Sequence, residues 1–76
     1  MINSYLVAFA DLEDHQCWVE RFEGRSIEEV QDKIRQHIVE DFNFDDNLPL
    51  NYNEMKKYLD KNYSILIGDI EDFETL

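Results

Sequence analysis

A capping motif divides the sequence into a part with strand patterning and a part with helix patterning. Ser26 is followed three residues later by Glu29, the spacing at which a serine hydroxyl caps a helix and the glutamate bonds back to it. Before this motif, apolar residues come in short runs rich in β-formers, and after it they recur at intervals of three and four. Such a chain is expected to fold as a small α+β domain.

Two apolar runs precede the capping motif and predict a pair of strands. The run 5–10 is apolar on both faces, which is typical of a central strand, and the run 17–22 follows after a short acidic connection. We therefore expect the two to pair as an antiparallel hairpin. A third strand is predicted over 63–68, buried at least on the side that carries Ile65 and Ile67.

The segment after the capping motif predicts a first amphipathic helix. Glu29 and Lys33 are four residues apart, a spacing that supports an ion pair on a helix surface. Its apolar residues form a single stripe made of Ile27, Val30, Ile34, Ile38 and Phe42.

A second, shorter helix is predicted after a long loop over 41–50, in which Pro49 disfavours helix in the residue before it. Asn51 and Glu54 repeat the capping spacing in a weaker form, and Asn62 is the expected left-handed residue at the other end. The apolar face of this helix consists of Tyr52, Met55, Tyr58 and Leu59.

These elements predict a single domain over 1–76 with the order β-β-α-α-β. Its architecture would be a three-stranded antiparallel sheet with two helices on one face. The tail 69–76 alternates acidic with apolar residues, so it either extends the third strand or folds back as an acidic arm.

The net charge is the strongest indication of function. The chain has 18 Asp and Glu against 7 Lys and Arg, a formal charge of −11 in 76 residues. Its hydrophobic content of 43% and aromatic content of 13% exceed those of a disordered acidic tail. An excess of this sign disfavours direct nucleic-acid binding, which depends on Lys and Arg, and association with an anionic membrane surface.

The sequence favours a cytoplasmic location. Cys17 is a single cysteine and forms no internal disulfide, whereas secreted domains of this size usually depend on several. We also find neither a signal-peptide pattern nor an apolar stretch of roughly twenty residues that would span a bilayer.

A nucleophilic site is conceivable but poorly supported. In an extended strand, His15 and Cys17 would share one face, as a Cys/His pair requires. The sequence supplies no third group to orient them, so we interpret Cys17 as a core or sheet-face residue and His15 as a turn residue. We predict no enzymatic activity and no cofactor.

One segment resembles the start of a calcium-binding loop. Where an EF-hand loop needs glycine at its sixth position this chain has Asp46, and where it needs glutamate at the twelfth it has Tyr52. No specific metal site is therefore predicted, although oxygen ligands alternate along Asp41, Asn43, Asp45 and Asn47.

Acidic segments and aromatic residues form the predicted partner-binding site. Carboxylates gathered on one face imitate phosphates and suit the basic cleft of a protein that normally holds nucleic acid. Tyrosines 5, 52, 58 and 63 and the single Trp exceed what so small a core is expected to hide, and such rings anchor protein interfaces. The predicted site comprises Asp11, Glu13, Asp14, Trp18, Glu40, Asp41, Asp45, Asp46, Asp69, Glu71, Asp72 and Glu74.

Two resemblances bear on function. In size, charge and compartment the chain is similar to the small acidic proteins with which phages and mobile elements block host nucleases and defence complexes, and to bacteriocin immunity proteins. The segment 24–30, GRSIEEV, resembles the Gly-x-Thr-x-Glu-Glu-Ala step of HicB-type antitoxins. The HicB pattern continues into further strands and a DNA-binding appendage, for which 76 residues leave little room.

We therefore expect an inhibitory binding protein, monomeric or weakly dimeric, whose acidic face occupies the basic, nucleic-acid-handling site of a partner protein. The alternative is an antitoxin-like regulatory module, or one dimeric through a sheet edge, in which the charge serves only solubility.

Overall fold

The computed structural model describes residues 2–44 and 48–72 and confirms the predicted α+β fold. Its antiparallel sheet has the strand order β2-β1-β3, and a fourth, short strand also pairs with β1. The elements along the chain are β1 (Asn3–Asp11), β2 (Gln16–Gly24), α1 (Ile27–Asp41), α2 (Tyr52–Tyr63), β3 (Ile65–Ile67) and β4 (Glu71–Asp72).

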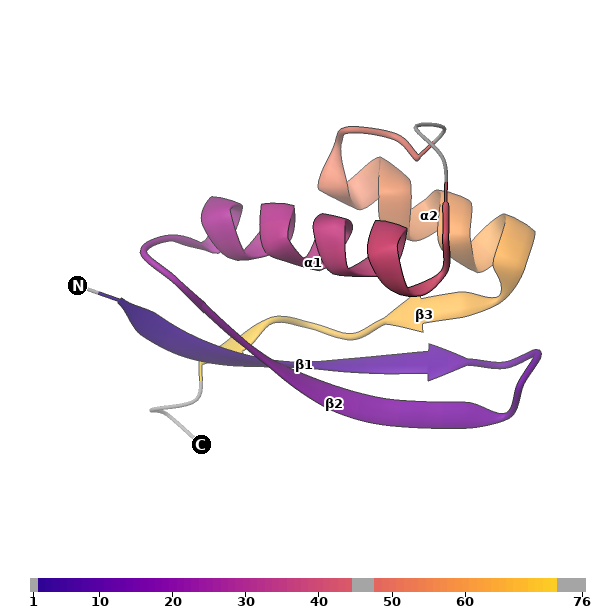
Figure 1. The fold of residues 1–76 in the computed structure, drawn as a ribbon, viewed down its shortest axis with the longest axis horizontal. Coiled ribbons are helices and arrows are strands. Elements are labelled where there is room, and N and C mark those ends of the chain that lie inside the picture. Colours follow the sequence, from indigo (N-terminus) through magenta and orange to yellow (C-terminus); the bar gives the residue numbers. More distant parts are fainter. Residues whose placement is uncertain (1, 45–47, 73–76) are drawn as a thin grey trace.

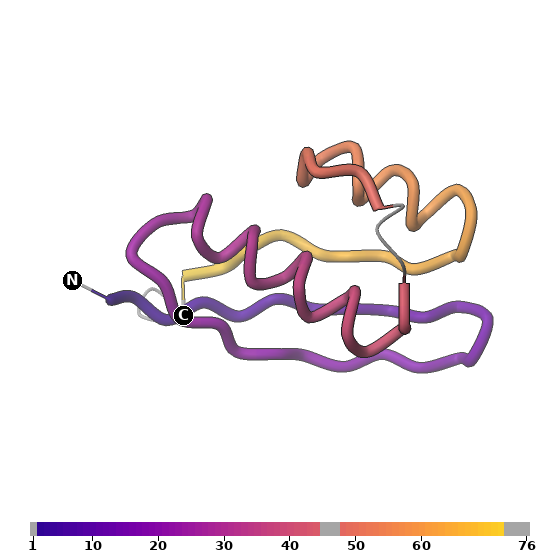
Figure 2. Tube along the Cα trace, turned by 45° about the horizontal axis from the view of Figure 1, so that its top comes forward, coloured from indigo at the N-terminus to yellow at the C-terminus, as the bar shows by residue number. Residues whose placement is uncertain are grey.

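The sheet forms one layer and both helices lie on the same face of it (Figure 1). β1 and β2 form a long hairpin, and α1 runs back along it toward the hairpin turn. The segment that holds β3 and β4 lies along the other side of β1 from β2 (Figure 2). Within the described ranges, the second face of the sheet is covered by no other element.

The hairpin is antiparallel, as predicted, and each of its strands is longer than predicted. Pairing runs from Asn3 opposite Gly24 to Asp11 opposite Gln16, which leaves residues 12–15 as the turn. His15 has a φ of 54°, so it is a turn residue as expected.

Side chains alternate along β1 between the helix face and the open face of the sheet. Tyr5, Val7 and Phe9 point toward the helices and are buried. On the opposite face Ala8 is exposed, although the run is apolar on both faces. The prediction of a central strand is confirmed. The strand is central because it pairs on both edges, whereas the helices cover only one of its faces.

The predicted cap of α1 is present. The Glu29 amide donates to the Ser26 hydroxyl oxygen at 3.2 Å, and the Glu29 carboxylate accepts from the Arg25 amide at 3.2 Å. Gly24 lets the end of β2 approach the helix, since a Cβ there would lie 2.9 Å from a methyl group of Val30. The expected pair of Glu29 and Lys33 has an N–O distance of 3.8 Å.

α2 begins as predicted and ends differently. The Glu54 amide donates to the Asn51 side-chain oxygen at 3.1 Å, which caps the first turn. The left-handed residue is Ser64, with φ 55°, and not Asn62. Asn62 stays helical and donates its side-chain amide to the Tyr58 carbonyl at 3.0 Å, so the chain leaves the helix two residues later.

The third strand is shorter than predicted and the tail returns along β1. Ile65 and Ile67 are buried, as expected, but β3 ends at Ile67. The Gly68 amide still donates to the Ala8 carbonyl at 2.8 Å, and β4 follows beside the first half of β1. The described residues include no helix that is long and apolar enough to span a membrane.

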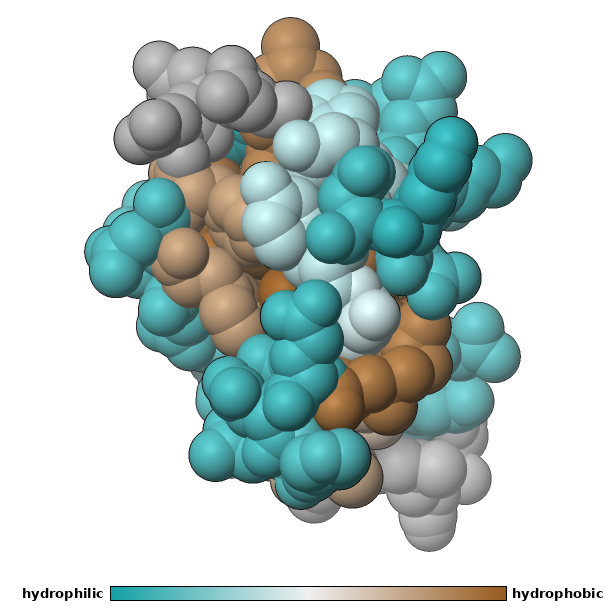
Figure 3. Space-filling view, turned by 90° about the vertical axis from the view of Figure 1, so that its right-hand side faces the viewer, coloured by the Kyte–Doolittle hydropathy of each residue, from teal (hydrophilic) through white to brown (hydrophobic). Residues whose placement is uncertain are grey.

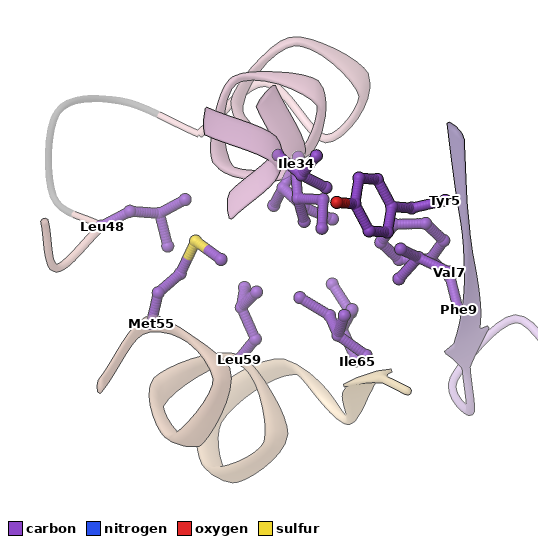
Figure 4. Packing of buried hydrophobic residues seen from close by; sticks show 11 residues of the cluster. Tyr5, Val7, Phe9, Ile34, Leu48, Met55, Leu59 and Ile65 are labelled. Atoms are coloured by element: carbon purple, nitrogen blue, oxygen red, sulfur yellow. The ribbon is translucent and has the colours of Figure 1, made fainter. Parts of the chain in front are cut away.

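The core lies between the helices and one face of the sheet (Figure 4). Five rings are expected to be too many for the core to bury. Of these, Tyr5 is buried, Trp18, Tyr52 and Tyr58 are partly buried, and Tyr63 is 37% exposed. The cluster is made of Tyr5, Val7, Phe9, Val30, Ile34, Ile38, Leu48, Met55, Leu59, Ile65 and Ile67.

Truncation of Ile34 tests this packing. Because its side chain is fully buried, we expect Ile34→Val to lower the free energy of unfolding by about 1 kcal/mol and Ile34→Ala by about 3 kcal/mol. Leu50→Ala is the matched control, since Leu50 is 85% exposed, and should change it by less than about 0.5 kcal/mol. Urea unfolding followed by Trp18 fluorescence measures all three, and equal effects at the two positions would contradict the packing.

Candidate functional site

Two of the predicted acidic segments lie toward the same end of the molecule. Glu13 and Asp14 lie in the turn between β1 and β2, and Glu40 and Asp41 are the last two residues of α1. α1 runs toward the end of the sheet that carries the hairpin turn and stops short of the turn itself (Figure 1), so the two pairs lie toward the same end of the molecule. We call these four residues the acidic end.

Trp18 joins these two segments through ring contacts. Its ring stacks on Phe9 at a centroid distance of 5.6 Å and lies 6.3 Å from Phe42, the residue after α1. The side chain is half-buried, with one part in the core and another at the surface. The structure therefore places the predicted aromatic anchor beside the acidic end.

The acidic end opposes the dipole of α1. The C-terminus of a helix carries partial negative charge, and basic residues in the last turn normally offset it. The last turn of α1 has no basic residue and contains Glu40 and Asp41, whereas α2 has Lys61 in its last turn. The arrangement is unfavourable for the helix and adds negative potential at this end.

His37 lies between the carboxylates of Asp41 on α1 and Glu20 on β2. Its Nε2 atom lies 3.1 Å from an Asp41 carboxylate oxygen and 3.8 Å from a carboxylate oxygen of Glu20 on β2. The ring packs between Phe9 and Phe22, with centroid distances of 5.8 and 5.7 Å. His37 thus brings the carboxylate of Glu20, which is not part of the acidic end, close to that of Asp41.

The remaining carboxylates of the acidic end lack basic partners among residues 2–44 and 48–72. Glu40 accepts a hydrogen bond from the neutral Gln36 amide at 3.2 Å, and Glu13 and Asp14 form no ion pair there. Their charge is therefore available to a partner.

Other predicted site residues lie elsewhere or have another role. Asp11 is 7% exposed and accepts a hydrogen bond from the Asp14 amide at 3.4 Å, so it shapes the turn and is not a surface carboxylate as expected. Asp69, Glu71 and Asp72 lie near the start of β1, away from the hairpin turn. Asp45, Asp46 and Glu74 are outside the described residues.

The end that carries the hairpin turn also has apolar surface. Figure 3 faces this side and shows hydrophilic groups around a patch of apolar and weakly polar side chains. Tyr63 is 37% exposed. The Leu12 amide donates to the Ser64 carbonyl at 3.1 Å, which ties the end of α2 to the turn. Hydrogen bonding to Tyr58, and then the charge of that residue, raises the pKa of the Tyr63 hydroxyl.

Sequence reasoning missed two exposed apolar residues near these elements. Leu12 lies in the hairpin turn itself, and Leu50 follows Pro49 beside α1. Arg35 donates to the carbonyls of Leu48 and Pro49 at 3.1 and 3.3 Å, which holds this loop on the helix and forms a groove of about 570 Å³. A lone apolar residue in a loop is common, so no sequence signal distinguished these two.

The structure brings together neither a nucleophilic pair nor a metal site within its described ranges. His15 is in a turn with positive φ, so the extended geometry that would align it with Cys17 is not formed, and Cys17 is exposed on the sheet face. In the described part of the chain, no group of three or more His, Cys, Asp or Glu side chains is arranged so that it could hold a metal ion. Asp45 and Asn47 of the candidate calcium loop lie outside it.

Tyr52 has the largest shift in pKa. Its hydroxyl is buried and has no hydrogen-bond partner among the described residues. Burial, and to a lesser extent the negative charge of Asp69, raises the pKa of Tyr52 to about 12.

This shift predicts a loss of stability in alkali. Above pH 10 the unfolded chain releases this proton while the folded chain keeps it, so stability falls as the pH rises from 10 toward 12. In Tyr52→Phe the fall should be smaller, with little change at neutral pH, because the removed hydroxyl has no partner. Urea unfolding of both proteins across this pH range measures the free energy of unfolding, and tyrosinate absorbance follows the ionisation. If that free energy fell equally in the two proteins, the prediction would be contradicted.

The opposed dipole predicts that loss of a charge stabilises the fold. We expect Glu40→Gln to raise the free energy of unfolding by about 0.5 kcal/mol at low salt, with a smaller gain at high salt. Glu28→Gln is the matched control because Glu28 lies in the first turn of the same helix, where a carboxylate is favourable. Both changes reduce the net charge from −11 to −10, so an equal effect on unfolding would rule out the dipole as the cause.

Comparison with known proteins identifies no relative: no protein-family model, curated protein or solved structure matches the chain.

Proposed function

We propose that this protein is an inhibitor of the phage or mobile-element type, which occupies the basic nucleic-acid-binding site of a partner protein with its acidic end. The observation that carries the proposal is the position of Glu40 and Asp41 at the negative end of α1, which points toward the end of the molecule with the hairpin turn. These groups reduce the stability of the helix, which favours a role for them outside folding.

Electrostatics would govern how such an inhibitor reaches its target. The net charge of −11 would steer the protein toward a basic cleft. The Glu13 and Asp14 side chains, which form no ion pair with a described residue, would enter it first. Association should therefore be fast at low salt and slow at high salt.

Aromatic contacts would govern how long the complex lasts. Trp18 is half-buried beside the acidic end, and Tyr63 is exposed near the same turn. Trp and Tyr in a partly desolvated setting are the residue types that most often dominate binding energy. A charged rim around such rings suits slow dissociation.

The unpaired edge of β2 favours one alternative. β2 is the outer strand of the sheet over nine residues, and in the described part of the chain no strand pairs with its free edge. Such an edge can pair with that of a second copy, as a dimeric regulatory module would do. Both copies would carry −11, so salt should strengthen this dimer but weaken the inhibitor complex.

A charge-matched pair of variants tests the proposal. In the first, Glu13→Gln, Asp14→Asn, Glu40→Gln and Asp41→Asn neutralise the acidic end. In the second, Glu28→Gln, Asp32→Asn, Glu54→Gln and Asp60→Asn neutralise four exposed acids elsewhere on the helices. Each variant has a net charge of −11 + 4 = −7, so they differ only in where the charge is lost.

The partner is captured from the host on the unmodified protein and eluted with a salt gradient, and its displacement from labelled nucleic acid is then measured. We expect the acidic-end variant to inhibit at least about tenfold less well, and the control to stay within about threefold of the unmodified protein. Equal losses would show that only total charge matters. A salt-strengthened dimer with no captured partner would favour the module.

A further inference from the structure

The open face of the sheet has a hollow that the proposed function does not use. It encloses about 320 Å³ and is lined by Leu6, Ala8, Val19, Asp69 and Glu71. Three of the five lining residues are apolar and two are acidic. The described elements leave this face uncovered.

Small residues in the middle of the sheet create the hollow. Ala8 pairs with Val19 on one side, and on the other side its carbonyl accepts the Gly68 amide at 2.8 Å. The centre of this face therefore carries only the methyl group of Ala8 and the backbone of Gly68, and the side chains around them are larger. Val19 is 61% exposed, so the apolar surface around this centre is open to a ligand.

Both carboxylates lie at the edge formed by the C-terminal segment. Glu71 pairs in register with Leu6, and Asp69 directly follows Gly68. The structure gives neither of them an ion pair within residues 2–44 and 48–72. Arg21 on β2 pairs in register with Leu6 from the other side. Its guanidinium group donates to Glu23 at 2.9 Å and to the Ser4 hydroxyl at 3.0 Å.

We propose that this hollow binds an arginine side chain from a partner protein. The aliphatic stem would lie on Leu6, Ala8 and Val19, and the guanidinium group would reach the carboxylates of Asp69 and Glu71. Arginine fits better than lysine, because its planar head is weakly hydrated and packs on apolar surface while it bonds to carboxylates. A second copy of this chain is a poor occupant because its own open face presents the same acids.

This inference does not rest on the proposed function, because the hollow and the acidic end use different residues. In the test, amide shifts of the ¹⁵N-labelled protein are followed during titration with N-acetyl-arginine methylamide. The citrulline analogue has the same shape without the charge, and the lysine analogue has the charge without the planar head.

We expect saturable shifts at Leu6, Ala8 and Val19 with the arginine compound and none with citrulline. The variant Asp69→Asn with Glu71→Gln should bind about tenfold more weakly, as loss of two exposed ion pairs implies. Ala8→Leu, which fills the hollow but keeps both charges, should also abolish the shifts at Leu6 and Val19. The control variant, Glu28→Gln with Glu54→Gln, removes two exposed acids on the helices and should leave the amide shifts on the sheet face unchanged.

The inference fails if the shifts appear at the acidic end and not on the sheet face, or if they survive both hollow variants. It also fails if the citrulline or lysine analogue binds as well as the arginine compound. None of these outcomes bears on inhibition by the acidic end, which the charge-matched variants measure separately.

Discussion

The packing of α1 against β1 is the contact on which the rest of the structure depends. Val30 and Ile34 on the helix and Val7 on the strand are completely buried, and together they form the centre of the core. This contact sets the direction of α1 along the hairpin, from Gly24 at one end to Trp18 and Phe42 at the other. A small domain buries little surface, so most of its stability must come from this one layer of contact.

The direction of α1 decides where the negative charge lies. The negative end of its dipole points toward the hairpin turn, and Glu40 and Asp41 add their charges at that end. A helix that packed in the opposite direction would place the same residues beside Gly24. The core therefore holds together groups that repel one another.

The one-sided architecture explains why this protein has two candidate surfaces. Both helices cover the same face of the sheet, which leaves Ala8 and Val19 uncovered and lets the C-terminal acids line their edge. The acidic end depends on the path of α1, whereas the hollow depends on the pairing of β1 with β2 and of β1 with the segment that holds β4.

Local patterns in the sequence determined the hairpin, both helix starts and the order of the elements. A cap such as Ser26 or Asn51 acts within three residues, so it can be recognised without knowledge of the fold. Only the tertiary structure decided that Asp11 is buried, that Asp69 and Glu71 border Ala8, and that α1 runs toward the hairpin turn. Those relations join residues distant in the chain, and they depend on which face a strand turns to the core and on the direction of a helix, which no short spacing encodes.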